Sequence, residues 1–563
     1  MLKRLIGQLL GARRSTPAEL VALGREQRGG GDPGAALVTL QTALRQDAEN
    51  AAAQAELGLT YRALGRGDEA RAAFERVVAC DPNSALALMY LGNLDHEAGR
   101  LDDAAKAYRA ALALDAQNAA VHYNLALTLM SLGEASAAVE SFRLCLAQAP
   151  DYADARSSML FALNLSDRAS VEEIAAEHFE WGRRIADPLW RERRFSNPPE
   201  AKRRLRIGYV SADFFGHVAA NFIHSFLPRH DRGLCQITCY CNAAIPEASR
   251  DLYGHTWRDI SGVDDAQAAS LIEQDAIDVL VDLSGHSRGN RLLVFARKPA
   301  PLQMTFLGYP NTTGMRAMDY RLTDAYADPP GASERRYRER LLRLPRGLWC
   351  YRPPVDGVSE AGPLPASRKG HVTFASMNNV AKLNPGLVGL WADLLRRVAD
   401  ARLILATIAP GSARERILRT FTGKGVDAQR IEFRDRLPRD EFLALHNEVD
   451  IALDSYPCNG GATTCETLWQ GVPVISLAGE AFQSRAGLSL LSNAGLPQLV
   501  AHSAADYLDI ASSLARDRER LGQLRAGLRE TLRISPLMDA AAFARALEAQ
   551  YRGAWREWCA ARG

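Results

Sequence analysis

The sequence predicts a solenoid of paired α-helices followed by two α/β lobes, each built on a largely parallel sheet. A 34-residue repeat runs through residues 17–152, and in the rest of the chain apolar runs typical of buried strands alternate with helical stretches. With 563 residues, 47% hydrophobic and 24% charged, the composition is that of a globular protein with about three or four domains. A net charge of +2 gives no bulk electrostatic reason to expect nucleic acid or membrane binding.

The four 34-residue blocks share a small residue after a leucine, a later glycine, and a leucine or aromatic residue further on. The blocks start at Pro17, Ala51, Ala85 and Ala119. The recurring residues are Gly24, Gly58, Gly92 and Ala126; Gly31, Gly65, Gly99 and Gly133; and Leu40, Phe74, Tyr108 and Phe142. This is the tetratricopeptide signature, which predicts a glycine turn between two antiparallel helices and an aromatic residue that fills the seam to the next repeat.

A stack of such repeats forms a curved solenoid, because one repeat cannot bury its apolar face alone. We expect its concave side to bind protein or peptide substrates. A spacer or an oligomerisation surface is the alternative. Residues 153–202 form a helical linker in this interpretation, since the repeat fades there while Ser170–Arg184 still has an amphipathic helical pattern.

The first α/β lobe is expected at residues 203–365. Its predicted strands are 205–214, 236–241, 277–283, 302–307 and 320–323. Ligands of such sheets sit outside the carboxyl ends of the strands. Three loops in that position bring Asp213, His217, Asp282 and His286 to one rim.

The second lobe is expected at residues 366–563, with terminal helices. Its predicted strands are 371–376, 402–407, 430–433, 450–454 and 473–477. The helix 385–397 should have Asn384 as its N-cap and Pro385 at its first position. Lys382 and the glycine-rich loop at Gly460 both follow strand ends, so they should share one edge of the sheet.

A βαβ unit around residues 450–477 predicts the phosphate site. The helix in this unit opens on Gly460–Thr464, where small residues leave backbone N–H groups accessible at the positive end of the helix dipole. Glu466 lies about one turn into the helix and could accept hydrogen bonds from a ribose. The alternative is that Thr463 and Glu466 form a capping box that only stabilises the helix start.

The repeats together with four motifs resemble the protein O-GlcNAc transferase family, including its plant SPINDLY-like members. The motifs are 213–217 (DFFGH), 307–310 (LGYP), 378–382 (NNVAK) and 458–466 (CNGGATTCE). The resemblance implies a GT-B fold of two Rossmann-like lobes. It also implies an inverting transferase that moves N-acetylglucosamine from UDP-GlcNAc to Ser or Thr hydroxyls of proteins, with no required metal or other cofactor.

The resemblance also implies roles for individual residues. Lys382 matches the pyrophosphate-binding lysine, and His217 matches a histidine proposed as base or acceptor-site residue, so both are the catalytic candidates. The expected nucleotide-binding residues are Asn379, Lys382, Gly461, Ala462, Thr463, Thr464 and Glu466. The expected sugar-binding residues are Leu307, Gly308 and Cys458. His286 and Asp282 are possible acceptor-site residues, with a positioning or structural role as the alternative.

Departures from the animal enzymes leave the donor open. This chain has Gly461-Ala462-Thr463 where they have His-Thr-Thr, Glu466 where they have Asp, and Phe442 where they have a nucleotide-contacting histidine. His286 and the segment 321–330 look more like the SPINDLY branch, which implies GDP-fucose as the alternative donor. A non-catalytic scaffold that senses nucleotide sugars is the alternative of another class.

Nine cysteines, scattered from Cys80 to Cys559, do not form a disulfide framework. Residues 1–14 have basic flanks and a short, broken apolar run, so we interpret them as a helix start rather than a targeting segment. These features, together with the low net charge, favour a cytoplasmic protein with no nucleic acid or membrane partner. The resemblance implies that the reaction releases UDP or GDP.

Overall fold

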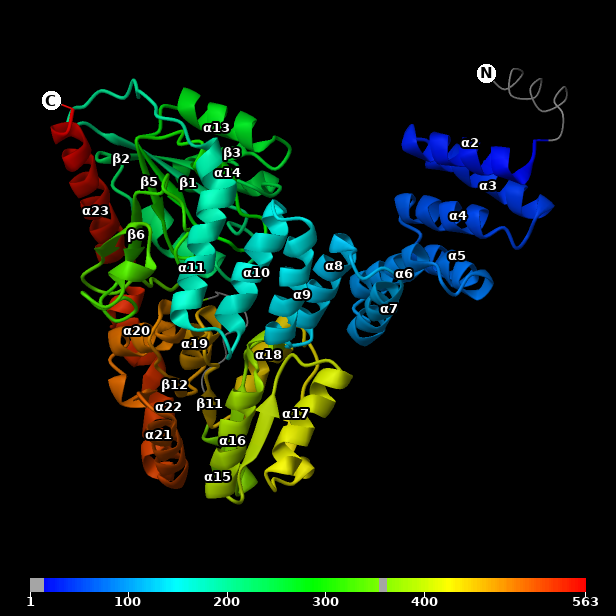
Figure 1. Cartoon of the computed structure of the whole chain (residues 1–563). Helices are drawn as coiled ribbons and strands as arrows, with labels where there is room; N and C mark the ends of the chain where they lie inside the picture. The colour runs from blue at the N-terminus through cyan, green and yellow to red at the C-terminus, as the bar shows by residue number, and fades with distance from the viewer. Residues whose placement is uncertain (1–14, 354–361, 563) are drawn as a thin grey trace. The chain divides into compact units, whose positions relative to one another are not determined.

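The computed structural model describes residues 15–353 and 362–562 (Figure 1). They form two compact parts, one comprising residues up to 132 together with 140–150, and the other comprising 133–139 together with 151 onward. The predicted helix start at residues 1–14 lies outside the described residues. Across the described residues, no helix combines the length and apolar content needed to cross a bilayer.

The repeat region consists of paired helices that follow the predicted blocks. They are α2 (Pro17–Gly29), α3 (Pro33–Gln46), α4 (Ala51–Ala63), α5 (Gly67–Cys80), α6 (Ala85–Glu97), α7 (Leu101–Leu114), α8 (Ala119–Ser131) and α9 (Ala135–Gln148). The first helix of each pair begins at the first residue of its block. The turn glycines Gly31, Gly65, Gly99 and Gly133 have φ of +86°, +70°, +76° and +76°. The turns therefore need residues that tolerate the left-handed region.

In the first three blocks the small residue lies against the large residue of the same block. A Cβ at Gly58 would come within 2.8 Å of the Phe74 ring, and one at Gly92 within 2.6 Å of the Tyr108 ring. Phe74 also stacks on Tyr90 of the following repeat at 5.0 Å between centroids. The aromatic residue thus fills the space inside its own helix pair as well as the predicted seam.

Another helix pair occupies the predicted linker. It consists of α10 (Ala153–Leu165) and α11 (Val171–Trp181). Helix α10 begins one repeat length after α8, so the register of the repeats continues although the sequence signature fades. Ser170 caps α11 by accepting a hydrogen bond from the Glu173 amide.

The first lobe is a seven-stranded parallel sheet in the order β3-β2-β1-β4-β5-β6-β7. The strands are β1 (Leu205–Ser211), β2 (Cys235–Cys241), β3 (Thr256–Asp259), β4 (Val279–Asp282), β5 (Leu302–Thr305), β6 (Tyr320–Thr323) and β7 (Arg340–Arg343). The helices are α12 (Ala220–Phe226), α13 (Asp265–Gln274) and α14 (Leu292–Ala296). The sequence did not predict β3 and β7, because these edge strands are partly exposed and lack an apolar run.

The second lobe is a six-stranded parallel sheet in the order β10-β9-β8-β11-β12-β13. The strands are β8 (Thr373–Ser376), β9 (Arg402–Leu405), β10 (Ile431–Phe433), β11 (Ile451–Leu453), β12 (Val474–Leu477) and β13 (Val500–Ala501). The helices are α15 (Pro365–Lys369), α16 (Pro385–Arg397), α17 (Ser412–Gly423), α18 (Arg439–Leu445), α19 (Ala462–Trp469), α20 (Ala486–Asn493), α21 (Ala504–Arg516) and α22 (Arg518–Arg533). Asn384 caps α16 as predicted.

The last helix, α23 (Ala540–Ala560), returns to the first lobe (Figure 1). The hydroxyl of Tyr551 lies 2.9 Å from that of Tyr209 on β1, and Glu548 lies 2.9 Å from the His230 ring. All four side chains are buried. The terminal helices therefore belong to both lobes, which is the arrangement of a GT-B fold.

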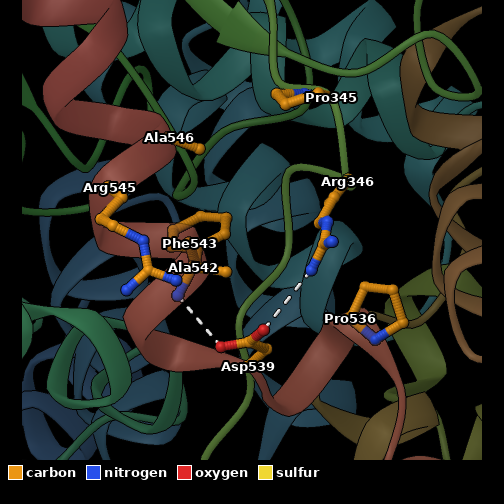
Figure 2. Close-up of a pocket in the computed structure, with 9 residues that line it drawn as sticks. Pro345, Arg346, Pro536, Asp539, Ala542, Phe543, Arg545 and Ala546 are labelled. Atoms are coloured by element: carbon orange, nitrogen blue, oxygen red, sulfur yellow. Dashed lines mark hydrogen bonds and ion pairs between the residues drawn. The ribbon is translucent and has the colours of Figure 1, made fainter.

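A pocket of about 340 Å³ lies where the chain crosses between the lobes (Figure 2). Arg346 and Asp539 form an ion pair across it at 3.5 Å, and Asp539 also caps α23 by accepting from the Ala542 amide. None of the predicted site residues lines this pocket. The candidate site is therefore located by the loops at the strand ends.

Candidate active site

Asp454, at the end of β11, organises the glycine-rich loop. Its buried carboxylate accepts hydrogen bonds from the Gly460 amide and the Ser476 hydroxyl, both at 2.7 Å. Burial raises the pKa of Asp454, whereas these hydrogen bonds and the Lys382 charge oppose that shift. The loop therefore has a fixed shape before any ligand arrives.

The Lys382 turn is attached to the same loop. Val380–Lys382 form a 3-10 turn that Asn379 caps by accepting from the Ala381 amide. The Lys382 ammonium donates to the Asn459 carbonyl at 2.7 Å, and the Asn384 amide donates to the Tyr456 carbonyl at 2.6 Å. The prediction that Lys382 and the Gly460 loop share one edge of the sheet is thereby confirmed.

Helix α19 begins at the predicted residue with free amide groups. Gly461 is its N-cap and provides no side-chain cap, and the first intrahelical bond runs from the Cys465 amide to the Gly461 carbonyl. In the described part of the chain, no backbone acceptor binds the Ala462, Thr463 or Thr464 amides. The capping-box alternative is wrong, since Thr463 lies inside the helix. Such a helix start can hold a phosphate group.

Glu466 is 7% exposed and already has a charged partner. Arg439 of α18 donates to both of its carboxylate oxygens, with 2.8 Å between Nη1 and Oε2. The buried Tyr351 hydroxyl has no partner among the described residues. Burial raises the pKa of Tyr351, and the nearby Cys465 and Glu466 add to this shift. A ribose at this position would meet an ion pair rather than a free carboxylate.

His217 is an exposed residue of the first-lobe loop, with 53% of its side chain accessible. Its Nδ1 lies 3.3 Å from the Ala219 amide and 3.6 Å from the Asp213 carboxylate. These two partners favour opposite tautomers of the neutral ring. The Ala219 amide donates a hydrogen bond to an unprotonated Nδ1, whereas the Asp213 carboxylate can only accept one from a protonated Nδ1. Burial raises the pKa of Asp213, and the nearby His217 opposes this shift.

His286 and Asp282 lie in the core rather than on the rim. His286 is 2% exposed, with Nε2 3.0 Å from the Thr313 carbonyl and Nδ1 3.2 Å from the Ser157 hydroxyl. Asp282 is 1% exposed, and burial raises its pKa to about 6, although hydrogen bonds from Thr305, Ser284 and Gly285 oppose this. This placement corrects the expected rim position and fits the positioning alternative, because helix α10 covers the histidine.

The predicted sugar-binding residues lie on loops with constrained backbones. Leu307 has φ of +71° and is buried, and a Cβ at Gly308 would collide with the Leu283 carbonyl. In the second lobe the half-buried Cys458 has its carbonyl bound by the Ser455 hydroxyl at 2.6 Å. Burial raises the pKa of Tyr309, and the neighbouring Cys458 adds to this shift. Cys458 therefore lies near the loop that contains Leu307 and Gly308.

Trp349 connects the loops of the two lobes. Its ring packs on Phe222 of α12 at 5.4 Å, five residues after His217, and lies 3.8 Å from a Cβ placed at Gly461. Its buried Nε1 has no partner among the described residues. The residues that sequence reasoning missed are Trp349, Tyr351, Arg439 and Asp454. Asp454 could have been found from the sequence, because it ends a predicted strand. The positions of the other three residues depend on tertiary contacts.

Within residues 15–353 and 362–562, no three His, Cys, Asp or Glu side chains gather as metal ligands would. The expectation that no metal is required stays a prediction.

Comparisons with known proteins agree with this fold. Tetratricopeptide repeat profiles match residues 28–94, 92–133 and 119–152. The mutant Thermobaculum terrenum O-GlcNAc transferase superposes with a TM-score of 0.82 at 37% identity, covering 92% of this chain and 99% of that one. The chain is thus a tetratricopeptide-repeat protein with a GT-B fold.

The profile of glycosyl transferase family 41 matches residues 152–350 and 364–547, so the chain belongs to this family. Oryza sativa "Probable UDP-N-acetylglucosamine--peptide N-acetylglucosaminyltransferase SPINDLY" is 37% identical over 75% of this chain and 46% of its own length. The Arabidopsis thaliana relative of the same description, SEC, is 30% identical over 63% of this chain and 38% of its own. The chain spans less than half the length of each of these two relatives.

Proposed function

We propose that this protein transfers a sugar from a nucleoside diphosphate to Ser or Thr hydroxyls of proteins. The observation that carries the proposal is the junction of the Lys382 turn with the loop before α19. The junction places a fixed cation beside a helix start with free N–H groups. Family membership and the printed descriptions of the relatives support the same reaction class.

The chemistry follows from where charge develops. The acceptor oxygen attacks the anomeric carbon, the bond from that carbon to the phosphate oxygen breaks, and the nucleoside diphosphate leaves with the bonding electrons. Lys382 and the amides of α19 would stabilise that leaving charge. The acceptor hydroxyl must lose its proton, and the exposed His217 is the candidate base. A donor phosphate oxygen or water is the alternative acceptor of this proton.

UDP-GlcNAc is the proposed donor, and GDP-fucose is the alternative. The printed descriptions of the SPINDLY and SEC relatives both name UDP-N-acetylglucosamine, which supports UDP-GlcNAc as the donor. The likeness of His286 and the segment 321–330 to the SPINDLY branch is the reason for keeping the alternative. We also propose that the repeats bind protein substrates and that the reaction proceeds without a metal in the cytoplasm. Neither nucleic acid nor membrane is expected as a partner.

Incubating the purified protein and a proteome with each donor tests the proposal. Nucleotide release and mass spectrometry should then identify one donor and modified Ser or Thr residues, while Lys382→Ala should abolish most of the signal. If neither donor is turned over but UDP or GDP binds, the protein is a non-catalytic sensor. If neither nucleotide binds, the nucleotide-sugar proposal is wrong.

A further inference from the structure

The turn of the fourth repeat lies against the turn that carries Lys382. Gly133 has φ of +76°, and a Cβ built on it would lie 2.6 Å from the Val380 carbonyl oxygen and 3.1 Å from Val380 Cγ2. Residues 133–139 and the second lobe belong to the same compact part of the chain. The backbone of the turn therefore approaches Val380 more closely than any side chain would allow.

The same Val380 carbonyl holds the Lys382 turn together. It accepts a hydrogen bond from the Leu383 amide at 2.9 Å, which closes the turn around Lys382. The Val380 side chain is 9% exposed and packs in the core, so it has little freedom to move away. A displacement of this carbonyl would shift Lys382 relative to its acceptor, the Asn459 carbonyl.

The repeat turn has a second contact with the lobe. The Glu134 carboxylate lies 3.2 Å from Nη1 of Arg416 on α17, and both side chains are less than one third exposed. A Cβ at Gly133 would also lie 3.3 Å from Arg416 Nη2. The turn therefore contacts both Val380 and Arg416 of the second lobe.

Two features of Gly133 favour glycine, its left-handed backbone and its contact with Val380, and the other turn glycines share the first of them. Gly31, Gly65 and Gly99 have the same left-handed backbone, but a Cβ on each of them would meet nothing within 4 Å. Of these four glycines, Gly133 is the one at which a Cβ would collide with the candidate active-site loop. Its backbone conformation accounts for a glycine in every repeat, whereas the contact with Val380 is particular to the fourth.

We propose that Gly133 is a positioning residue for Lys382. The bare Cα of the repeat turn sets where the Val380 carbonyl lies, and the carbonyl sets where the ammonium lies beside the leaving phosphate. This inference rests on the proposed function. A misplacement of about 1 Å can cost a reaction up to a hundredfold even when the changed residue is distant from the chemistry.

The test compares Gly133→Ala with Gly99→Ala in the full-length protein. Both variants introduce the same left-handed strain, and Gly133→Ala adds the close contact with Val380, so its melting temperature should fall further than that of Gly99→Ala. Donor hydrolysis and transfer to a short peptide should lose about tenfold in kcat in Gly133→Ala, with a change of less than about threefold in donor KM. Gly99→Ala should retain wild-type kcat.

A double-mutant cycle gives the decisive measurement. In a Lys382→Ala background the further loss from Gly133→Ala should disappear, because the residue it positions is absent. Equal kcat for the Gly99 and Gly133 variants, or an undiminished loss in the Lys382→Ala background, would overturn the inference while leaving the proposed function intact. No effect of Lys382→Ala itself, or no turnover by the wild type, would overturn both.

If Gly133→Ala does not fold, Glu134→Gln provides the second variant. It introduces no backbone strain and loosens the same turn by removing its ion pair with Arg416. A fall in kcat that depends on Lys382 supports the inference, and an unchanged kcat contradicts it.

Discussion

Lys382 donates a hydrogen bond to the carbonyl oxygen of Asn459, with 2.7 Å between the two atoms. This bond joins the loop after β8 to the loop after β11, and it holds the ammonium at a residue three positions before the start of α19. The cation and the helix amides are therefore in place before a donor binds. Such preorganisation stabilises charge that develops as the leaving group departs.

Lys382→Ala should lower kcat by about a hundredfold or more, the effect of removing a preorganised electrostatic group, with a smaller change in donor affinity. Steady-state kinetics and calorimetric titration of UDP and GDP measure the two effects. Lys424→Ala is the matched control, because Lys424 pairs with Asp393 on the surface of the same lobe. An equal loss in both variants would show that the effect is one of fold rather than of chemistry.

Glu466→Gln should weaken binding of the nucleoside diphosphate by about 1 to 3 kcal/mol if Glu466 holds the ribose, the range for hydrogen bonds to charged groups. Arg439→Gln is the informative partner, since it releases the carboxylate from its ion pair and leaves it to accept from a ribose. Titrations of UDP and GDP on both variants compare them. Equal loss of affinity together with equal loss of melting temperature would mean that the pair serves the fold alone.

Asp282 predicts a pH dependence of stability. Its folded pKa of about 6 lies above the ordinary value of 3.8, because burial disfavours the carboxylate. Between these values the native state binds more protons than the unfolded state, so stability falls as the pH rises from about 4 to 6, by about 3 kcal/mol for a shift of two units. Asp282→Asn lacks this titration. The melting temperature of the variant minus that of the wild type should increase from about pH 4 to 6. A difference that does not change with pH would contradict the prediction.

The repeat array should supply binding energy rather than chemistry. Deleting residues 1–132 keeps the turn at Gly133 with the catalytic part of the chain. The deletion should impair modification of whole proteins more than donor hydrolysis or transfer to short peptides, because remote contacts contribute through binding. The three assays run side by side measure this. Equal loss in all of them would instead show that the array is required for folding.

Periodic and local features were predictable from the sequence. The block starts, the turn glycines, the Asn384 cap and the start of α19 depend on neighbours within a few residues. Arg439 could not be predicted as the partner of Glu466, because the two residues meet through the packing of α18 on α19. The burial of His286 could not be predicted either, because the motif around it is polar and the covering helix α10 lies more than a hundred residues earlier.

The role of His217 can be determined from its pH profile and its tautomer. A histidine that acts as the base must be unprotonated, so wild-type activity should show an acid limb. His217→Ala should reduce kcat and lose that limb.

A base needs an unprotonated Nε2 that faces the acceptor hydroxyl. The ring proton must then be on Nδ1 and point toward Asp213, so that Nδ1 does not accept from the Ala219 amide. Asp213→Asn should therefore lower kcat without changing donor affinity. If the His217 variant keeps the acid limb and loses acceptor or donor affinity instead, His217 is a binding residue, and a donor phosphate oxygen or water takes the proton.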